Sequence, residues 1–267
     1  MNSNSSPSVW LIALLCVLLA PASFAAGVSP SKFELRARPG QVLRDTVRIL
    51  NPGEQTEEFE ISTADWRLND DGGIEFVEDT LLEDSCRPWV RLERRTVSID
   101  PGAERNYRFE VHVPDEAASG LCRFAILIEP TEAYLARIGN GAISIPMVAR
   151  FAVVTYVTIG DAMPDIELVG VGTTMVEGHR LPTLTLSNRG NTFDRAFGEL
   201  IATDFQGQRT RLVPSAFPVL PGRSEAIQLK LDMTAEEAQL FTLQYPLRLS
   251  GRVEIGGKVL EIDEVLE

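Results

Sequence analysis

The sequence contains little of the chemistry on which most enzymes depend. It has only two histidines, His112 and His179, and no Gly-x-Ser-x-Gly segment, phosphate-binding loop or Cys-x-x-Cys pair. A catalytic triad or a histidine-based metal centre needs several such groups to converge. The many acidic residues form no distinctive motif, and the stretch at residues 69–84 lacks the spacing of a calcium-binding loop. We therefore predict that the protein is not an enzyme and binds neither a metal nor a cofactor.

Positive charge is also scarce. The 25 Lys and Arg residues are outnumbered by 38 Asp and Glu, so the formal net charge is -13 and the sequence pI is near 4.7. Binding to nucleic acid requires a basic patch that neutralises phosphates. Nucleic acid is therefore excluded as a partner.

Long apolar runs are missing apart from residues 9–20, which are too few to span a membrane comfortably. Pro21 and a series of mostly small residues through Ala26 follow this run. The pattern predicts a signal peptide over residues 1–25. We expect export to the periplasm and no membrane span in the mature protein.

Cysteine is rare, and Cys16 belongs to the predicted signal peptide, which leaves Cys86 and Cys122. An oxidising compartment favours pairing of the two as a disulfide. Such a bridge would close a loop of about 36 residues and stabilise the fold by roughly 3 to 4 kcal/mol. Two separate buried thiols are the alternative.

What the sequence does contain is a succession of short alternating segments separated by Gly, Pro and Asn turns. These segments predict strands at residues 28–37, 42–50, 57–68, 89–92, 96–99, 105–113, 120–129 and 142–157, and then at 166–171, 181–188, 198–203, 210–213, 225–231, 247–255 and 259–262. Helical turns are expected only at residues 133–138 and 234–241. The fold class is therefore all-β, with two tandem immunoglobulin-like β-sandwiches.

The two halves of the chain carry similar turn signals in the same order. Asn51-Pro52-Gly53 corresponds to Asn188-Arg189-Gly190, and Pro101-Gly102 corresponds to Pro221-Gly222. Residues 160–164 read as the linker between the halves. We expect an N-terminal domain over residues 26–160 and a C-terminal domain over residues 161–267.

The longest predicted strand, residues 142–157, is unusual because it is apolar on both faces and carries Arg150 as its only charge. Pro146 cannot donate to a central ladder, so the first half of the strand is expected at a sheet edge. Proteins normally protect an apolar edge unless another chain pairs with it. This strand is the candidate binding element.

The arrangement resembles a known family. The residues that carry the resemblance are Val28-Ser29-Pro30, Pro39-Gly40, the strand ending at Asn51, Trp89, Pro101-Gly102, Val113-Pro114, Gly120-Leu121-Cys122-Arg123 and the apolar strand before the second sandwich. Together they resemble the periplasmic pilus-assembly chaperones of the chaperone-usher pathway and their less characterised relatives. The resemblance implies a chaperone that binds secreted pilus or fimbrial subunits by adding the final strand of its first domain to their fold, and it suggests an outer-membrane usher as a further partner.

The resemblance also implies which residues form the site. The client-binding strand would present Ile143, Ile145, Met147, Val148, Ala149 and Phe151. Family members hold the carboxylate at the subunit's C-terminus with two cations, for which Arg36 and Arg150 are the nearest candidates here, and ordinary surface charge is the alternative. The alternative function is a structural or adhesive immunoglobulin-like envelope protein in which the strand packs against the second domain.

Overall fold

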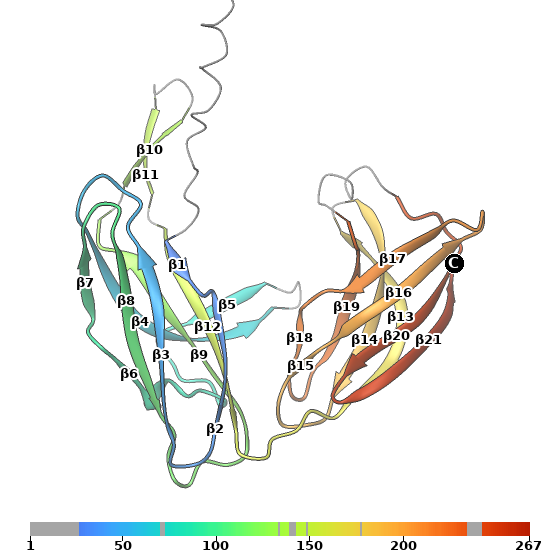
Figure 1. Cartoon of the computed structure of the whole chain (residues 1–267), viewed down its shortest axis with the longest axis horizontal. Coiled ribbons are helices and arrows are strands. Elements are labelled where there is room, and N and C mark those ends of the chain that lie inside the picture. Colours follow the sequence, from blue (N-terminus) through green and yellow to red (C-terminus); the bar gives the residue numbers. More distant parts are fainter. Residues whose placement is uncertain are drawn as a thin grey trace, which may run out of the picture.

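The chain folds into two β-sandwiches joined at one end (Figure 1). This computed structural model describes residues 27–69, 73–132, 134–138, 143–147, 149–176, 178–233 and 242–267, and for residues 134–138 and 143–147 it describes the backbone. Among these residues the only helical element is a short 3-10 helix, Arg87–Trp89. None of the described helices is long and apolar enough to cross a membrane. The predicted signal peptide and the helical turn predicted at residues 234–241 lie outside the described residues.

The first sandwich is built from the strands up to residue 159. They are β1 (Val28–Ser29), β2 (Lys32–Ala37), β3 (Val42–Leu50), β4 (Glu57–Leu68), β5 (Ile74–Val77), β6 (Val90–Leu92), β7 (Thr96–Ile99), β8 (Glu104–His112), β9 (Gly120–Pro130), β10 (Tyr134–Ile138), β11 (Ile143–Met147) and β12 (Phe151–Ile159). One sheet has the order β1-β3-β8-β6, and the facing sheet has the order β2-β12-β9-β4-β5 with β7 beside β4. Strands β10 and β11 pair with each other.

The second sandwich contains the strands from residue 166 onward. They are β13 (Ile166–Val176), β14 (His179–Asn188), β15 (Asp194–Arg195), β16 (Phe197–Asp204), β17 (Arg209–Pro214), β18 (Pro218–Val219), β19 (Ser224–Leu231), β20 (Leu247–Ile255) and β21 (Lys258–Leu266). Seven of them form one sheet in the order β13-β14-β19-β17-β16-β20-β21. The sheet folds over so that β13 contacts β21, and it encloses a core of leucine, isoleucine and valine.

Alternation places the core residues as expected for a sheet with one buried face. In β8, Tyr107, Phe109 and Val111 are buried, while the residues between them face outward. Phe109 packs edge-on against Phe33 of one facing strand and Phe124 of another. This aromatic contact lies in the centre of the first core.

The turn signals shared by the two halves form matching structures. Asn51 is buried, and its amide nitrogen donates to the carbonyl groups of Gln55 and Ile99. Asn188 is buried in the second sandwich and donates in the same way to Thr192 and Val219. In both sandwiches the asparagine side-chain oxygen accepts from the glycine two residues later, and the asparagine carbonyl accepts from the glycine of the Pro-Gly turn. A buried amide that replaces the lost hydrogen bonds of a turn is stable in such a position.

Four sequence predictions are corrected. Residues 28–37 form two strands, because Pro30 has no amide to donate and the chain passes from β3 to β12 at this point. Residues 142–157 also form two strands, β11 and β12. Residues 133–138 were expected as a helical turn, but β10 pairs with β11 there. The acidic connection at residues 69–84 contains β5, which pairs with the end of β4.

Cys86 and Cys122 form a disulfide that fastens the 3-10 helix to β9, with 5.5 Å between the Cα atoms. Both cysteines lie in the first core. The predicted pairing is present in the structure.

Replacing Cys86 and Cys122 together by serine should lower the free energy of unfolding by roughly 3 to 4 kcal/mol, because the unfolded chain gains the freedom of a loop of about 36 residues. Chemical denaturation of both proteins measures this difference. Thiol labelling of the unfolded, unreduced wild type should find no free cysteine other than any Cys16 that remains, and two labelled thiols from these positions would contradict the pairing.

Candidate functional site

Strands β10 and β11 form an arm, defined here as residues 134–138 and 143–147, that extends beyond the end of the first sandwich (Figure 1). The pairing is antiparallel, from Tyr134 opposite Met147 to Ile138 opposite Ile143. Within the described part of the chain, β11 pairs with no other strand, so its second edge is unpaired. This edge is the site that the sequence predicts in outline.

The predicted site residues are divided between the arm and β12. The backbones of Ile143, Ile145 and Met147 lie in β11, and their side chains are outside the described residues, as is the whole of Val148. Ala149 lies between the strands, and Phe151 opens β12 and packs against the first core.

Strand β12 is not an edge strand. It lies between β2, which runs parallel to it, and β9, which runs antiparallel. Val153, Val157 and Ile159 point into the first core. The alternate residues Ala152, Val154 and Tyr156 belong to a second cluster on the other face of the sheet, which includes residues of the second sandwich. The second half of the predicted long strand is therefore fully integrated in the first sandwich.

Arg150 lies where the arm returns to the sheet. Its Nε donates to Glu129 over 2.6 Å and its Nη1 donates to Glu78 over 2.5 Å. These two hydrogen bonds raise the pKa of Arg150 above its ordinary value. Glu129 is the next-to-last residue of β9, and Glu78 follows β5.

Arg36 lies elsewhere. It is exposed on β2, opposite Thr158 in the parallel register, and it makes no ion pair with the described residues. Arg150 precedes Thr158 by eight positions, which corresponds to about 26 Å along a strand. The structure does not bring Arg36 and Arg150 together, so these two residues do not form a two-cation site.

A joint of aromatic side chains connects the two sandwiches, and sequence reasoning missed it. Tyr156 of β12 is buried between Trp66 of β4, at 5.0 Å between ring centroids, and Phe193 of the second sandwich, at 4.4 Å. Burial raises the pKa of the Tyr156 hydroxyl. Leu220 from the second sandwich is buried in the same cluster.

Polar contacts surround the aromatic joint. Arg195 stacks over the rings of Tyr156 and Phe193, and its Nη1 donates to Glu34 of β2 over 2.6 Å. Thr158 and Thr192 share a buried hydrogen bond of 3.0 Å. Side chains of the second sandwich thus contact the outer face of the sheet that contains β12.

A hollow of about 500 Å³ lies at the joint. Its lining comes from both sandwiches and includes Arg123, Arg223, Asp84, Glu83 and Asn191. Arg123 is paired with Asp84 and stacks on Trp66, and its Nη1 is buried without a partner among the described residues. Two arginines and two carboxylates leave this lining without an excess of charge.

The acidic stretch after β5 is organised by an arginine. Arg87 Nη1 donates to the carbonyl groups of Val77 and Thr80, both at 3.3 Å, and lies 3.9 Å from the buried carboxylate of Asp65. Asp65 in turn accepts from the amide of Leu82. No group of three or more potential metal ligands is found within the described ranges.

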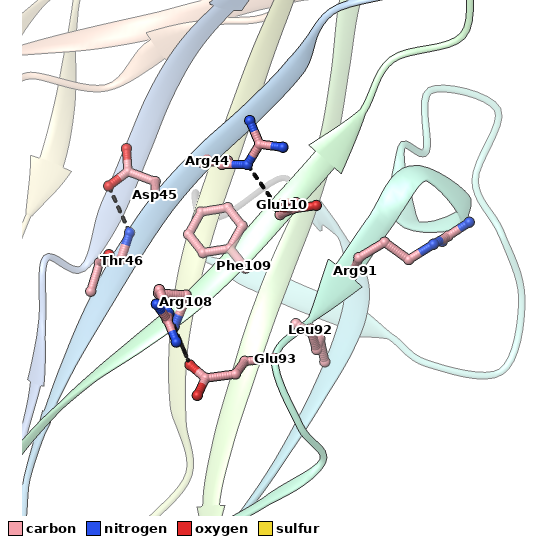
Figure 2. A pocket seen from close by; sticks show the side chains of 9 residues that line it. All are labelled: Arg44, Asp45, Thr46, Arg91, Leu92, Glu93, Arg108, Phe109 and Glu110. Carbon is pink, nitrogen blue, oxygen red and sulfur yellow. Dashed lines mark hydrogen bonds and ion pairs between the residues drawn. The ribbon is translucent and has the colours of Figure 1, made fainter.

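A second hollow, of about 480 Å³, lies on the outer face of the sheet that contains β3, β8 and β6 (Figure 2). Arg44 donates to Glu110 over 2.7 Å, and Arg108 lies 3.6 Å from Glu93. Figure 2 shows the guanidinium groups of Arg44, Arg91 and Arg108 pointing in different directions. These charges neutralise one another and do not converge on a ligand position. Hydrogen bonding from the Arg108 backbone, with nearby arginines, lowers the pKa of Glu93.

No protein-family model matches the sequence, and no curated protein matches it. Several solved structures do. The class 5 fimbriae chaperone CfaA is 9% identical, with a TM-score of 0.45, and the match covers 90% of this chain and 98% of that chain. A chain of the CsuC-CsuE chaperone-tip adhesion subunit complex from Acinetobacter baumannii is 14% identical, with a TM-score of 0.41 and the same coverage of 90% and 98%. The CupB2 chaperone of Pseudomonas aeruginosa is 10% identical, with a TM-score of 0.40 and coverage of 90% and 100%.

The lowered pKa of Glu93 predicts a pH dependence of stability. A carboxylate whose folded pKa lies below its unfolded value stabilises the fold above the unfolded pKa, near 4.5, and loses this contribution as pH falls through the folded pKa. Glu93→Gln should therefore be less stable than the wild type at pH 7, with the difference shrinking below pH 4.5. Urea denaturation from about pH 3 to about pH 7 measures the stability difference between the two proteins. A difference that does not change with pH would contradict the lowered pKa of Glu93.

Removing the central ring of the joint should loosen the two sandwiches. We expect Tyr156→Ala to broaden the distribution of distances between spin labels at Ser98 and Gln206, both exposed and in different sandwiches. Tyr245→Ala is the control, because Tyr245 packs against the second core and stacks on Arg180, away from the joint. Equal distributions for Tyr156→Ala and the wild type would show that the joint does not hold the sandwiches.

Proposed function

We propose that the protein is a periplasmic chaperone that binds secreted pilus or fimbrial-type subunits by β-strand addition. The observation that carries this proposal is the edge of β11 that pairs with no strand in the described ranges, in an arm that lies beyond the main sheets (Figure 1). An unpaired strand edge is a template for another chain. In strand addition the backbone supplies the hydrogen bonds and alternate side chains fill pockets of the partner.

The sequence of β11 suits this role. Ile143, Ile145 and Met147 alternate along it and are all apolar. Burial of one such side chain contributes roughly 1.5 to 3 kcal/mol. Burial of all three in a client would therefore contribute about 5 to 9 kcal/mol to the free energy of binding, before the entropic costs of association. A client that lacks a strand of its own sandwich has a matching apolar groove.

The alternative is a structural or adhesive envelope protein in which the strand at residues 142–157 packs against the second sandwich, and the β12 part of this stretch does contact that sandwich through Tyr156. The described part of the chain contains no pairing between β11 and a strand of that sandwich. The face of the first sandwich that contacts the second one is formed by β12 and its neighbours. The alternative thus accounts for β12, whereas the position of β11, paired with β10 outside the main sheets, favours the chaperone.

The same proposal assigns roles to the rest of the chain and to a further partner. We assign residues 26–160 to the client-binding domain, residues 161–267 to a supporting domain, and residues 1–25 to the signal peptide. Arg36, exposed on β2 next to Thr158, is the cation that we propose for a client carboxylate. An outer-membrane usher would receive the client from the chaperone.

The deciding experiment uses Ile145→Asp. If β11 is added to a client, the carboxylate is forced unpaired into an apolar groove, which costs about 4 kcal/mol and reduces affinity roughly a thousandfold. The protein is purified from the periplasm of its native host with its bound proteins, which are identified by mass. Amides of residues 143–147 should exchange slowly in the complex and faster after the client is released.

Ile74→Asp is the matched control, because Ile74 is 44% exposed on the edge strand β5 of the same sandwich. It should retain the client. Val148→Asp covers the opposite parity of the strand, since Val148 lies outside the described residues. If Ile145→Asp and Val148→Asp both destabilise the free protein and the folded fraction still holds its client, the structural alternative is correct.

A further inference from the structure

The arm is connected to the first sandwich by two short segments. The chain leaves β9 at Pro130, forms the arm, and re-enters the sheet at Phe151, the first residue of β12. Phe151 and Ile128 are the last pair between β12 and β9, and β9 stays paired with β4 through Glu129 and Pro130. The base of the arm therefore lies next to Glu129, near the end of β9, and Arg150, the residue before β12.

Arg150 joins three parts of the molecule at this point. Its hydrogen bond to Glu129 links the returning segment to the end of β9, and its hydrogen bond to Glu78 links both to the segment after β5. The two bonds use different nitrogens, Nε and Nη1, so both form at once. A guanidinium group presents its donors in a fixed fork, which a lysine cannot do.

The surroundings of Arg150 are acidic. Glu60 of β4 is directly opposite Glu129 in the antiparallel register, and Glu78 is the third carboxylate. Carboxylates placed opposite each other repel. Without Arg150, this repulsion would act at the base of the arm.

We propose that Arg150 is a positioning residue, which aims the arm by clamping its base through Glu129 and Glu78. This inference rests on the proposed function, because an arm that is already held in one direction loses less conformational entropy when it pairs with a client. It replaces the role that the sequence suggested for Arg150, the binding of a client carboxylate. The clamp acts on the arm and not on the core, since the side chain of Arg150 is 44% exposed.

The test measures the arm in the free protein. Arg150→Gln should make the amides of residues 134–138 and 143–147 exchange about threefold to fivefold faster, as expected for the loss of two exposed ion pairs that hold a local structure. The thermal midpoint should be nearly unchanged. Spin labels at Ser144 and Ser98 should give a broader distance distribution in the variant.

Arg248→Gln is the matched control, because Arg248 also makes two hydrogen bonds to a carboxylate on an exposed sheet face, at 2.6 Å each, but in the second sandwich. It should leave exchange of the arm unchanged. The charge swap Arg150→Glu with both Glu129→Arg and Glu78→Arg restores opposite charges in the two pairs and should recover most of the protection. Arg150→Lys should recover less than half.

The inference is wrong if Arg150→Gln leaves both the exchange rates and the distance distribution of the arm as in the wild type. It is also wrong if the thermal midpoint of Arg150→Gln falls clearly below that of the wild type, because Arg150 would then support the whole sandwich. These results concern the free protein and do not depend on a client. If the clamp is confirmed but Ile145→Asp retains its client, the proposed function fails and the positioning of the arm stands.

Discussion

The central constraint in this structure is that both faces of β12 are buried, each against a different part of the molecule. One face completes the first core through Val153, Val157 and Ile159, and the other face presents Tyr156 to the joint with the second sandwich. A strand with two buried faces has a fixed register, because a shift by one residue would exchange the two sets of side chains. Strand β2, strand β9 and the second sandwich all take their positions from it.

This constraint explains why the candidate site lies before β12 and not in it. Every backbone group of a central strand is used by its neighbours, so this stretch can pair with another chain only through a part that lies outside the sheet. The arm provides such a segment, and β11 continues into β12 through Arg150. The central strand and the exposed edge are thus parts of one continuous stretch of chain.

Local patterns were sufficient for much of the fold. The alternation of residues 42–50 and the paired Asn and Pro-Gly turns predict β3 and the two matching turns, since each depends on neighbours in sequence. The two strand breaks were missed for a different reason. An unbroken apolar stretch such as residues 142–157 has the same composition whether it makes one strand or two, and only the partners β10, β2 and β9 distinguish them.

The sequence alone determined the all-β class, the two similar halves, the disulfide partners and the stretch in which binding is proposed, because composition, turn chemistry and alternation act over short distances. The tertiary structure decided the roles of the charged residues. Arg36 and Arg150 read alike in the sequence, yet Arg36 is exposed on β2 without an ion pair to any described residue, while Arg150 is held between Glu78 and Glu129. Glu78 is 72 residues away along the chain, and such an ion pair forms only when folding brings distant segments together.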